Sequence, residues 1–250
     1  MRLRYKILSA MLIVVTLVVA PAATWLVIGS ADAPPPDDAD LLVPPPEVPE
    51  EENAFPLLLE AAEARFWLDG QDWLDGPPPE GAGEDALTDR ERLDYMTTGE
   101  KWDEALAETV LARNREALAL LDRAMARPHL QMPVLESVAF ETPYIYGFLQ
   151  LAKVQALQSR AEARNGRAAQ ALETALDVVE LGDRLERGSN CAVSYLVGLT
   201  VRGQGLLLLC DHAAKAPLAA DNMRRVADRL AELPPRGDAL AGVWRAEYRV

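Results

Sequence analysis

The side chains that most often carry chemistry are few in this sequence and widely spaced. His129 and His212 are the two histidines, and neither has a second histidine three or four residues away. A helical zinc site needs such a pair, or cysteines and carboxylates at comparable spacing. We therefore predict no catalytic, cofactor-binding or metal-binding residue and no cofactor, and we interpret each histidine as a surface residue or a satisfied core residue.

Short catalytic motifs are missing from the sequence or incomplete in it. Gly203-Gln204-Gly205 lacks a third glycine and falls inside a predicted helix, so it does not predict a nucleotide-binding turn. Glu60 and Glu63 share one helix face, as metal ligands of four-helix bundles do, but no Glu-x-x-His partner accompanies them. A solvated face is the favoured interpretation. Arg236-Gly237-Asp238 spells an adhesion tripeptide, although Asp238 is also the predicted N-cap of the last helix.

Cys191 and Cys210 fall on one predicted helix. At about 1.5 Å per residue they would lie roughly 28 Å apart, far beyond the reach of a disulfide. We predict two small buried thiols.

A tandem repeat contains two tryptophans, Trp67 and Trp73, each followed by Leu-Asp-Gly. Beside Asp69, Asp72 and Asp75 these rings form either a recognition or ligand-binding loop, or a loop held to the core by its indoles. The second interpretation is favoured, because tryptophan is usually largely buried.

One apolar segment, Ile7–Ile28, has Arg2, Arg4 and Lys6 before it and no charged residue within it. As a helix it spans about 33 Å, which matches a bilayer core of about 30 Å. The flanking cations predict a cytoplasmic N-terminus, with the rest of the chain outside the cytoplasmic membrane. The alternative is cleavage following Ala33, at the small residues of Ala31-Asp32-Ala33, which would release a secreted or periplasmic protein. The length of the segment favours an uncleaved anchor.

Residues 31–52 are rich in proline and carboxylates and contain no cation. Polyproline II segments and like-charge repulsion predict an extended spacer, at about 3.1 Å per residue. The predicted domains are thus an anchor over 1–30, a linker over 31–52 and a helical domain over 53–250. The last helix reaches Val250 without a capping residue, so we expect either that the natural chain continues past Val250 or that another subunit covers the apolar face of this helix.

The net charge of −14 is spread along the chain. A surface of that sign repels phosphate backbones, so we predict no nucleic-acid partner. The expected partners are the membrane, through Ile7–Ile28, and a protein of unknown identity.

Apolar periodicity and capping signals predict an all-α domain of six to eight helices. Residues 191–214 are apolar nearly all round, which indicates either a buried core helix or a second membrane span. Arg202 near the midpoint would be costly in a bilayer, so we predict a core helix around which the others pack as antiparallel hairpins. The predicted helices cover residues 54–67, 88–98, 100–126, 143–165, 167–187, 191–214 and 219–233, with a last helix after Asp238.

Two resemblances accompany this layout. Gly166 followed by Ala171 resembles the start of a second helix in tetratricopeptide repeats, but no 34-residue period recurs. Asp38-Ala39-Asp40-Leu41 and Glu51-Glu52-Asn53-Ala54-Phe55, placed after an anchor and around prolines, resemble a loose group of uncharacterised membrane-anchored bacterial helical proteins. That resemblance implies no activity and no site residue.

The function that these observations favour is a membrane-anchored, extracytoplasmic interaction or scaffold protein. One alternative is an enzyme whose active site is completed by sequence beyond Val250. The other is a helical domain that binds a small ligand or lipid.

Overall fold

The computed structural model describes residues 46–66, 89–134, 144–215, 219–234 and 240–245. The chain divides into two compact units, Met1–Val43 and Pro44–Val250, and the helices discussed below all belong to the second. The predicted anchor Ile7–Ile28, the cleavage site at Ala33 and most of the predicted linker lie outside the described residues.

The all-α prediction is confirmed for the part of the chain that the structure describes. These residues form eight named helices and a short helical segment over residues 240–245, with one isolated bridge between Asn53 and His129 as their sole β pairing. The helices are α2 (Phe55–Ala64), α3 (Asp89–Thr98), α4 (Glu104–Arg113), α5 (Arg115–Met125), α6 (Tyr144–Arg164), α7 (Ala168–Arg187), α8 (Ala192–Lys215) and α9 (Ala220–Glu232).

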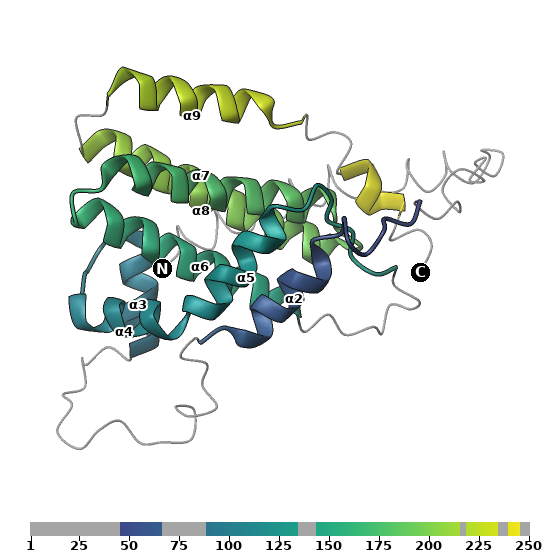
Figure 1. The fold of residues 1–250 in the computed structure, drawn as a ribbon, viewed down its shortest axis with the longest axis horizontal. Helices are drawn as coiled ribbons and strands as arrows, with labels where there is room; N and C mark the ends of the chain where they lie inside the picture. Colours follow the sequence, from purple (N-terminus) through teal and green to yellow (C-terminus); the bar gives the residue numbers. More distant parts are fainter. Residues whose placement is uncertain (1–45, 67–88, 135–143, 216–218, 235–239, 246–250) are drawn as a thin grey trace, which may run out of the picture. The chain divides into compact units, whose positions relative to one another are not determined.

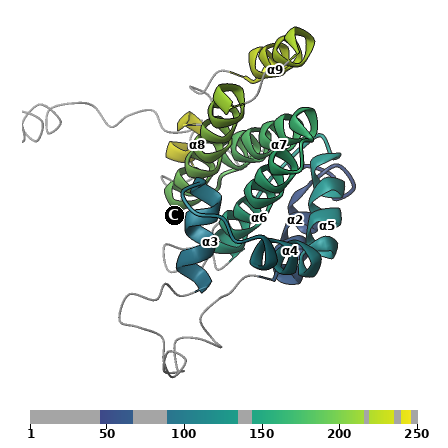
Figure 2. The same ribbon diagram turned by 90° about the vertical axis from the view of Figure 1, so that its left-hand side faces the viewer.

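Helices α6 and α7 lie between the other helices of this unit (Figures 1 and 2). Helices α2 and α5 pack together on one side, and α8 packs along α7 on the other. Helices α3 and α4 contact α6, and α9 lies on the outside of α7. Consecutive helices are joined by short connections where they pack side by side, such as the turn at residues 165–167 between α6 and α7.

The prediction that residues 191–214 form the centre of the domain is wrong. Helix α6 buries 14 of its 21 residues and α7 buries 12 of 20, whereas α8 buries only seven of 24. Apolar residues all round a helix were interpreted as burial all round. In α8 they instead divide into one packed side and one exposed side.

The predicted helix over 100–126 is two helices, α4 and α5, separated at Asn114. Asn114 is fully buried, and its side-chain amide donates to the carbonyls of Phe66 (2.6 Å) and Val110 (2.8 Å). Its carbonyl oxygen accepts the Phe66 N–H at 2.8 Å. Asparagine side chains compete in this way with helical hydrogen bonds, and here the competition holds the end of α2 against α4.

Several predicted boundaries agree with the structure. Helix α3 ends at Thr98, before Gly99 (φ 85°), and α6 ends before Gly166 (φ 74°). Glycine adopts these left-handed angles without the steric cost that a Cβ brings. Helix α2 is shorter than predicted and ends at Ala64.

Folded structure begins before the predicted residue 53. Gln131, in the connection between α5 and α6, accepts a hydrogen bond from the Val48 N–H and donates one to the Pro46 carbonyl, both at 2.9 Å. The side chain of Asn53 accepts a hydrogen bond from the backbone N–H of Gln131 and donates one to its backbone carbonyl, both at 2.9 Å. The last part of the predicted linker, residues 46–52, is therefore hydrogen-bonded to the helical unit.

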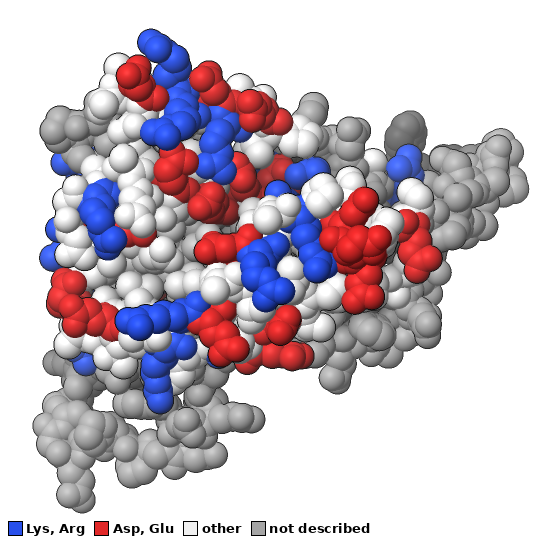
Figure 3. All heavy atoms as spheres, viewed as in Figure 1, with Lys and Arg blue, Asp and Glu red and all other residues white. Residues whose placement is uncertain are grey.

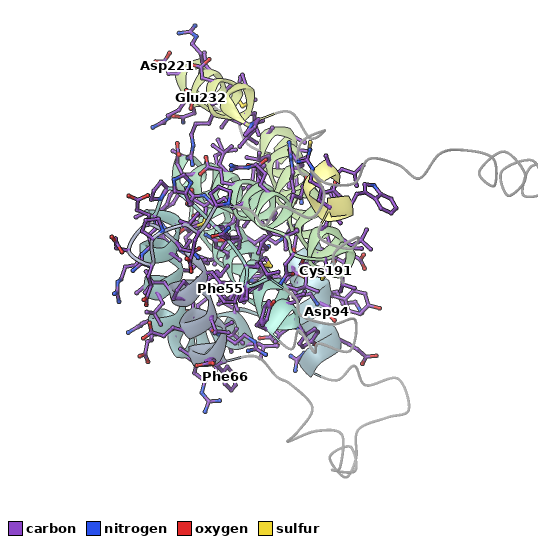
Figure 4. The ribbon with its side chains drawn as sticks, turned by 90° about the vertical axis from the view of Figure 1, so that its right-hand side faces the viewer. Phe55, Phe66, Asp94, Cys191, Asp221 and Glu232 are labelled. Carbon is purple, nitrogen blue, oxygen red and sulfur yellow. The ribbon has the colours of Figure 1, made fainter. Side chains whose placement is uncertain are left out.

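Helix α9 is held to α7 mainly by charge. Arg229 contacts Glu173 (2.9 Å), Asp177 (3.3 Å) and Glu180 (2.5 Å), while Val226 is the buried apolar residue of α9. Figure 4 shows α9, with the labelled Asp221 and Glu232, outside the packed helices. On the face drawn in Figure 3, acidic and basic side chains are interspersed, consistent with such pairing.

Candidate functional site

The side of α8 that faces away from α7 carries exposed apolar side chains. Val193 and Leu196 are each 58% exposed and Leu207 is 72% exposed. Thr200 and Cys210 are also exposed, and a Cβ built on Gly203 would meet no atom within 4 Å. These six residues recur at alternating steps of three and four, which keeps them on one face of a helix. We call them the outer stripe of α8: Val193, Leu196, Thr200, Gly203, Leu207 and Cys210.

A second series with the same spacing faces inward. Its members are buried, and the glycines among them touch the backbone of α7. A Cβ at Gly198 would lie 2.6 Å from the Glu186 nitrogen, and one at Gly205 would lie 2.6 Å from the Val179 nitrogen. The close contact between the two helices therefore requires these glycines. The inner series is Ser194, Gly198, Val201, Gly205, Leu208 and His212.

Arg202 lies beside the inner series and fixes α8 on α7 by charge. Its guanidinium is 3.3 Å from the carboxylate of Asp183 and 3.6 Å from that of Glu186, both of which are buried. Among the described residues, α8 is the one helix long and apolar enough to cross a membrane by length and composition. Arg202 therefore packs against α7, although α8 is not the buried core helix that was predicted around it.

A small basic cleft lies where the C-terminal end of α8 meets α6 and the residues after α3. Its volume is about 210 Å³, below the 300–1,000 Å³ that is typical of pockets for drug-sized ligands. Three cations and one carboxylate line it, and Arg164 stacks over the Trp102 ring at 5.1 Å. The charged lining residues are Arg160, Arg164, Lys215 and Asp211.

Arg160 connects three elements in the wall of this cleft. It donates to the carbonyls of Thr97 and Thr98 at 2.9 Å, at the end of α3, and to Asp211 of α8 at 2.6 Å. Burial raises the pKa of Asp211, but hydrogen bonds from Lys215 and Arg160 outweigh that effect and place the pKa below its usual value. Asp211 is thus a fixed anion that offsets part of the positive charge of the cleft.

His212 and Ser159 form a buried pair beside the cleft, with His212 Nε2 2.7 Å from Ser159 Oγ. The Ser159 hydroxyl also lies 2.8 Å from the Ala171 carbonyl oxygen, to which it donates. A hydroxyl has one hydrogen, so Ser159 accepts from His212 rather than giving it a proton. Desolvation and the charge of Arg160 lower the pKa of His212, which favours the neutral ring. This pair is a satisfied core contact, not an activated nucleophile.

The other chemistry-bearing residues are apart from this pair. His129 has a half-exposed side chain near Glu52, and Glu60 and Glu63 are exposed, as the solvated-face interpretation predicted. Both cysteines are free; Cys191 is buried but Cys210 is exposed, so the prediction of a buried thiol at 210 is wrong. Within the described ranges, no three histidine, cysteine or carboxylate side chains are grouped to hold a metal ion.

Several predicted features lie outside the described residues. They include the tryptophan repeat at Trp67 and Trp73, the tripeptide at residues 236–238 and Thr88, the first residue of the helix predicted over 88–98.

The outer stripe was missed from the sequence because all apolar residues of α8 were assigned to the core. The signal was present in the spacing. Two interleaved series run along α8, and the inner one contains glycine at positions 198 and 205, where a close neighbour requires it.

Comparison of this chain with family models, with curated proteins and with solved structures finds no match.

Proposed function

We propose that this chain is a membrane-tethered, extracytoplasmic interaction protein without a catalytic centre of its own, and that it binds its partner through the outer stripe of α8. The observation that carries the proposal is the exposure of Val193, Leu196 and Leu207 on one helix face. Exposed apolar rows of this kind mark interaction surfaces in soluble domains. The partner it fits is an amphipathic helix presenting its own apolar row.

Tethering is the second part of the proposal. It is supported by the sequence of Ile7–Ile28, whose length and flanking cations suit a single-pass anchor with the helical unit outside the cytoplasmic membrane. The array of helical hairpins behind α8 acts as a rigid support for the stripe.

Site-specific photo-crosslinking in intact cells tests the proposed surface. A photoreactive residue at Leu207 is expected to capture a defined protein, whereas the same residue at Arg224, which has a 73% exposed side chain on α9, is not. If positions 196 and 207 both capture nothing above the level at 224, the proposal is wrong.

Membrane fractionation tests the tether. The full chain is expected to stay with membranes at alkaline pH, and deletion of residues 1–30 is expected to release it. Recovery in the soluble fraction of a shortened chain that begins after Ala33 would show cleavage instead of anchoring.

A second candidate function rests on the basic cleft. Arg164, Lys215 and the Trp102 ring suit a small carboxylate or phosphate, because charge-assisted hydrogen bonds and a stacked guanidinium both favour anions. Titration with inorganic phosphate and succinate tests it, monitored by the tryptophan fluorescence that W102F lacks, because the chain has five tryptophans. The R164A/K215A variant should lose the response, and an unchanged response would argue against the cleft.

A further inference from the structure

Resting on the proposed interaction surface, we infer that the partner of the outer stripe is a second copy of this chain, with the two α8 helices antiparallel. The inference starts from the order of residue sizes along the stripe. From either end the second residue is a leucine, and the other four positions hold smaller residues: Val193, Leu196, Thr200, Gly203, Leu207, Cys210.

This order is self-complementary about a two-fold axis between residues 201 and 202. Antiparallel pairing places Leu196 of one copy opposite Leu207 of the other. Thr200 then faces Gly203, and Val193 faces Cys210. The spacing of three and four residues is that of a coiled-coil seam, and in this antiparallel register each step of three faces a step of three and each step of four faces a step of four. Two-fold symmetry of this kind is the commonest arrangement of soluble oligomers.

The middle of the stripe allows close approach. Gly203 has no atom within 4 Å of where a Cβ would lie, and Thr200 beside it is exposed. Small residues at the crossing point let two helix axes come near each other while the leucines on either side interdigitate.

Charge also selects this face for self-association. Two copies that each carry a net charge of −14 repel one another, so pairing requires a surface free of carboxylates. Between Glu186 and Asp211 the sequence has no acidic residue, and Arg202 is turned inward against Asp183 and Glu186. The outer stripe therefore adds no like-charge contact.

The area of the stripe suits a weak interface. It is about 26 Å long on a helix about 10 Å wide, which corresponds to roughly 260 Å² on each copy and about 520 Å² over both copies. That lies in the range of transient complexes. Confinement of both copies to one membrane raises their effective concentration and favours such a pair.

Oxidative crosslinking of the full chain in liposomes tests the register. In V193C the new thiol faces Cys210 of the second copy, so a disulfide-linked dimer is expected. In the wild type the two Cys210 residues lie at opposite ends of the seam, about 25 Å apart, so no dimer is expected. The matched control is V134C, because Val134 is 53% exposed and lies off α8, and the V193C/C210S variant should lose the crosslink.

The outcomes separate this inference from the proposed function. Crosslinking of the wild type through Cys210 would indicate parallel pairing, and equal crosslinking of V134C would indicate random collision; either result overturns the inference. The inference is also overturned if neither the wild type nor any cysteine variant forms a dimer. Light scattering provides a second measurement, in which the wild type should have the mass of a dimer and L196D/L207D the mass of a monomer. If photo-crosslinking from Leu207 captures a different protein, the interaction function stands and the second copy is excluded.

Discussion

Gly205 of α8 lies directly against the backbone of Val179 in α7, so that a Cβ on Gly205 would sit 2.6 Å from the Val179 nitrogen. Gly203, two residues earlier on the same helix, faces open space. The two glycines make a matched pair for testing the contact between these helices.

We expect G205A to lower the free energy of unfolding by about 1–3 kcal/mol, because the neighbouring atoms are backbone and cannot move aside cheaply. G203A should raise it by up to about 1 kcal/mol, because alanine has the higher helix propensity and meets no neighbour. Urea denaturation monitored by circular dichroism measures both. Equal effects of the two substitutions would contradict the close approach of α7 and α8.

Removing the side chain at Asn114 should destabilise the junction of α4 and α5. N114A leaves both the N–H and the C=O of Phe66 without their present partners, and we expect a loss of roughly 2–3 kcal/mol. N165A, at the exposed turn after α6, should change stability by less than about 0.5 kcal/mol. Chemical denaturation compares them, and similar values for both variants would show that Asn114 is not a structural junction.

Arg229 should control the attachment of α9. In R229A, Asp177 and Glu180 on α7 lose the cation that they share, while Glu173 keeps its pair with Arg225. Helix α9 should therefore loosen and become more sensitive to proteases, with a loss of about 1 kcal/mol. R224A is the control, because Arg224 pairs only with the highly exposed Asp221 in the contacts seen here. Limited proteolysis at low and high salt measures how fast α9 is cleaved in both variants. Protection of α9 in R229A equal to the wild type would contradict this role.

The buried His212 should make stability fall with pH below about 6.5, the pKa of an unperturbed histidine. Burial and Arg160 lower the pKa of His212 in the folded state, although Asp211 opposes this shift. The unfolded chain therefore takes up a proton that the folded chain does not, and acid favours unfolding.

Unfolding measured at pH 7.5 and 5.5 tests this effect. In H212Q the free energy of unfolding should change less between the two pH values than in the wild type. In H129Q it should change as in the wild type, because that variant keeps the buried His212 and His129 has a half-exposed side chain. Carboxylates with raised pKa, such as Asp122 and Asp177, are common to both variants and cancel in the comparison. Identical pH profiles for the two variants would contradict a buried neutral imidazole.

Helix periodicity and glycine placement were sufficient to predict the fold class and the positions of α3, α6, α7 and α9 within a few residues. These signals are local, since an amphipathic stripe or a left-handed glycine depends on neighbours in the sequence. The break at Asn114 depends instead on Phe66, which is distant in sequence and whose backbone competes for the asparagine side chain.

The role of α8 could not be predicted for a different reason. Whether an apolar residue such as Leu207 is buried or exposed depends on how many other helices pack around α8 in the folded chain. Composition alone does not give that number. The glycines at 198 and 205 carried the missing information, because they show which side of the helix has a close neighbour. The cleft around Arg160 is lined by residues that follow α3 and by residues of α6, α7 and α8, and no local motif in the sequence indicates it.

The hydrogen bonds of Gln131 have a mechanical consequence. Any pull on the chain ahead of residue 46 reaches the helical unit first through the contacts of Gln131 with Pro46 and Val48, and then through Asn53. Because residues 46–52 are mostly exposed and are held by hydrogen bonds and not by a buried helix face, we expect tension to detach them before it unfolds the packed helices. A load applied ahead of residue 46 would then extend this short segment first and leave the helical unit folded.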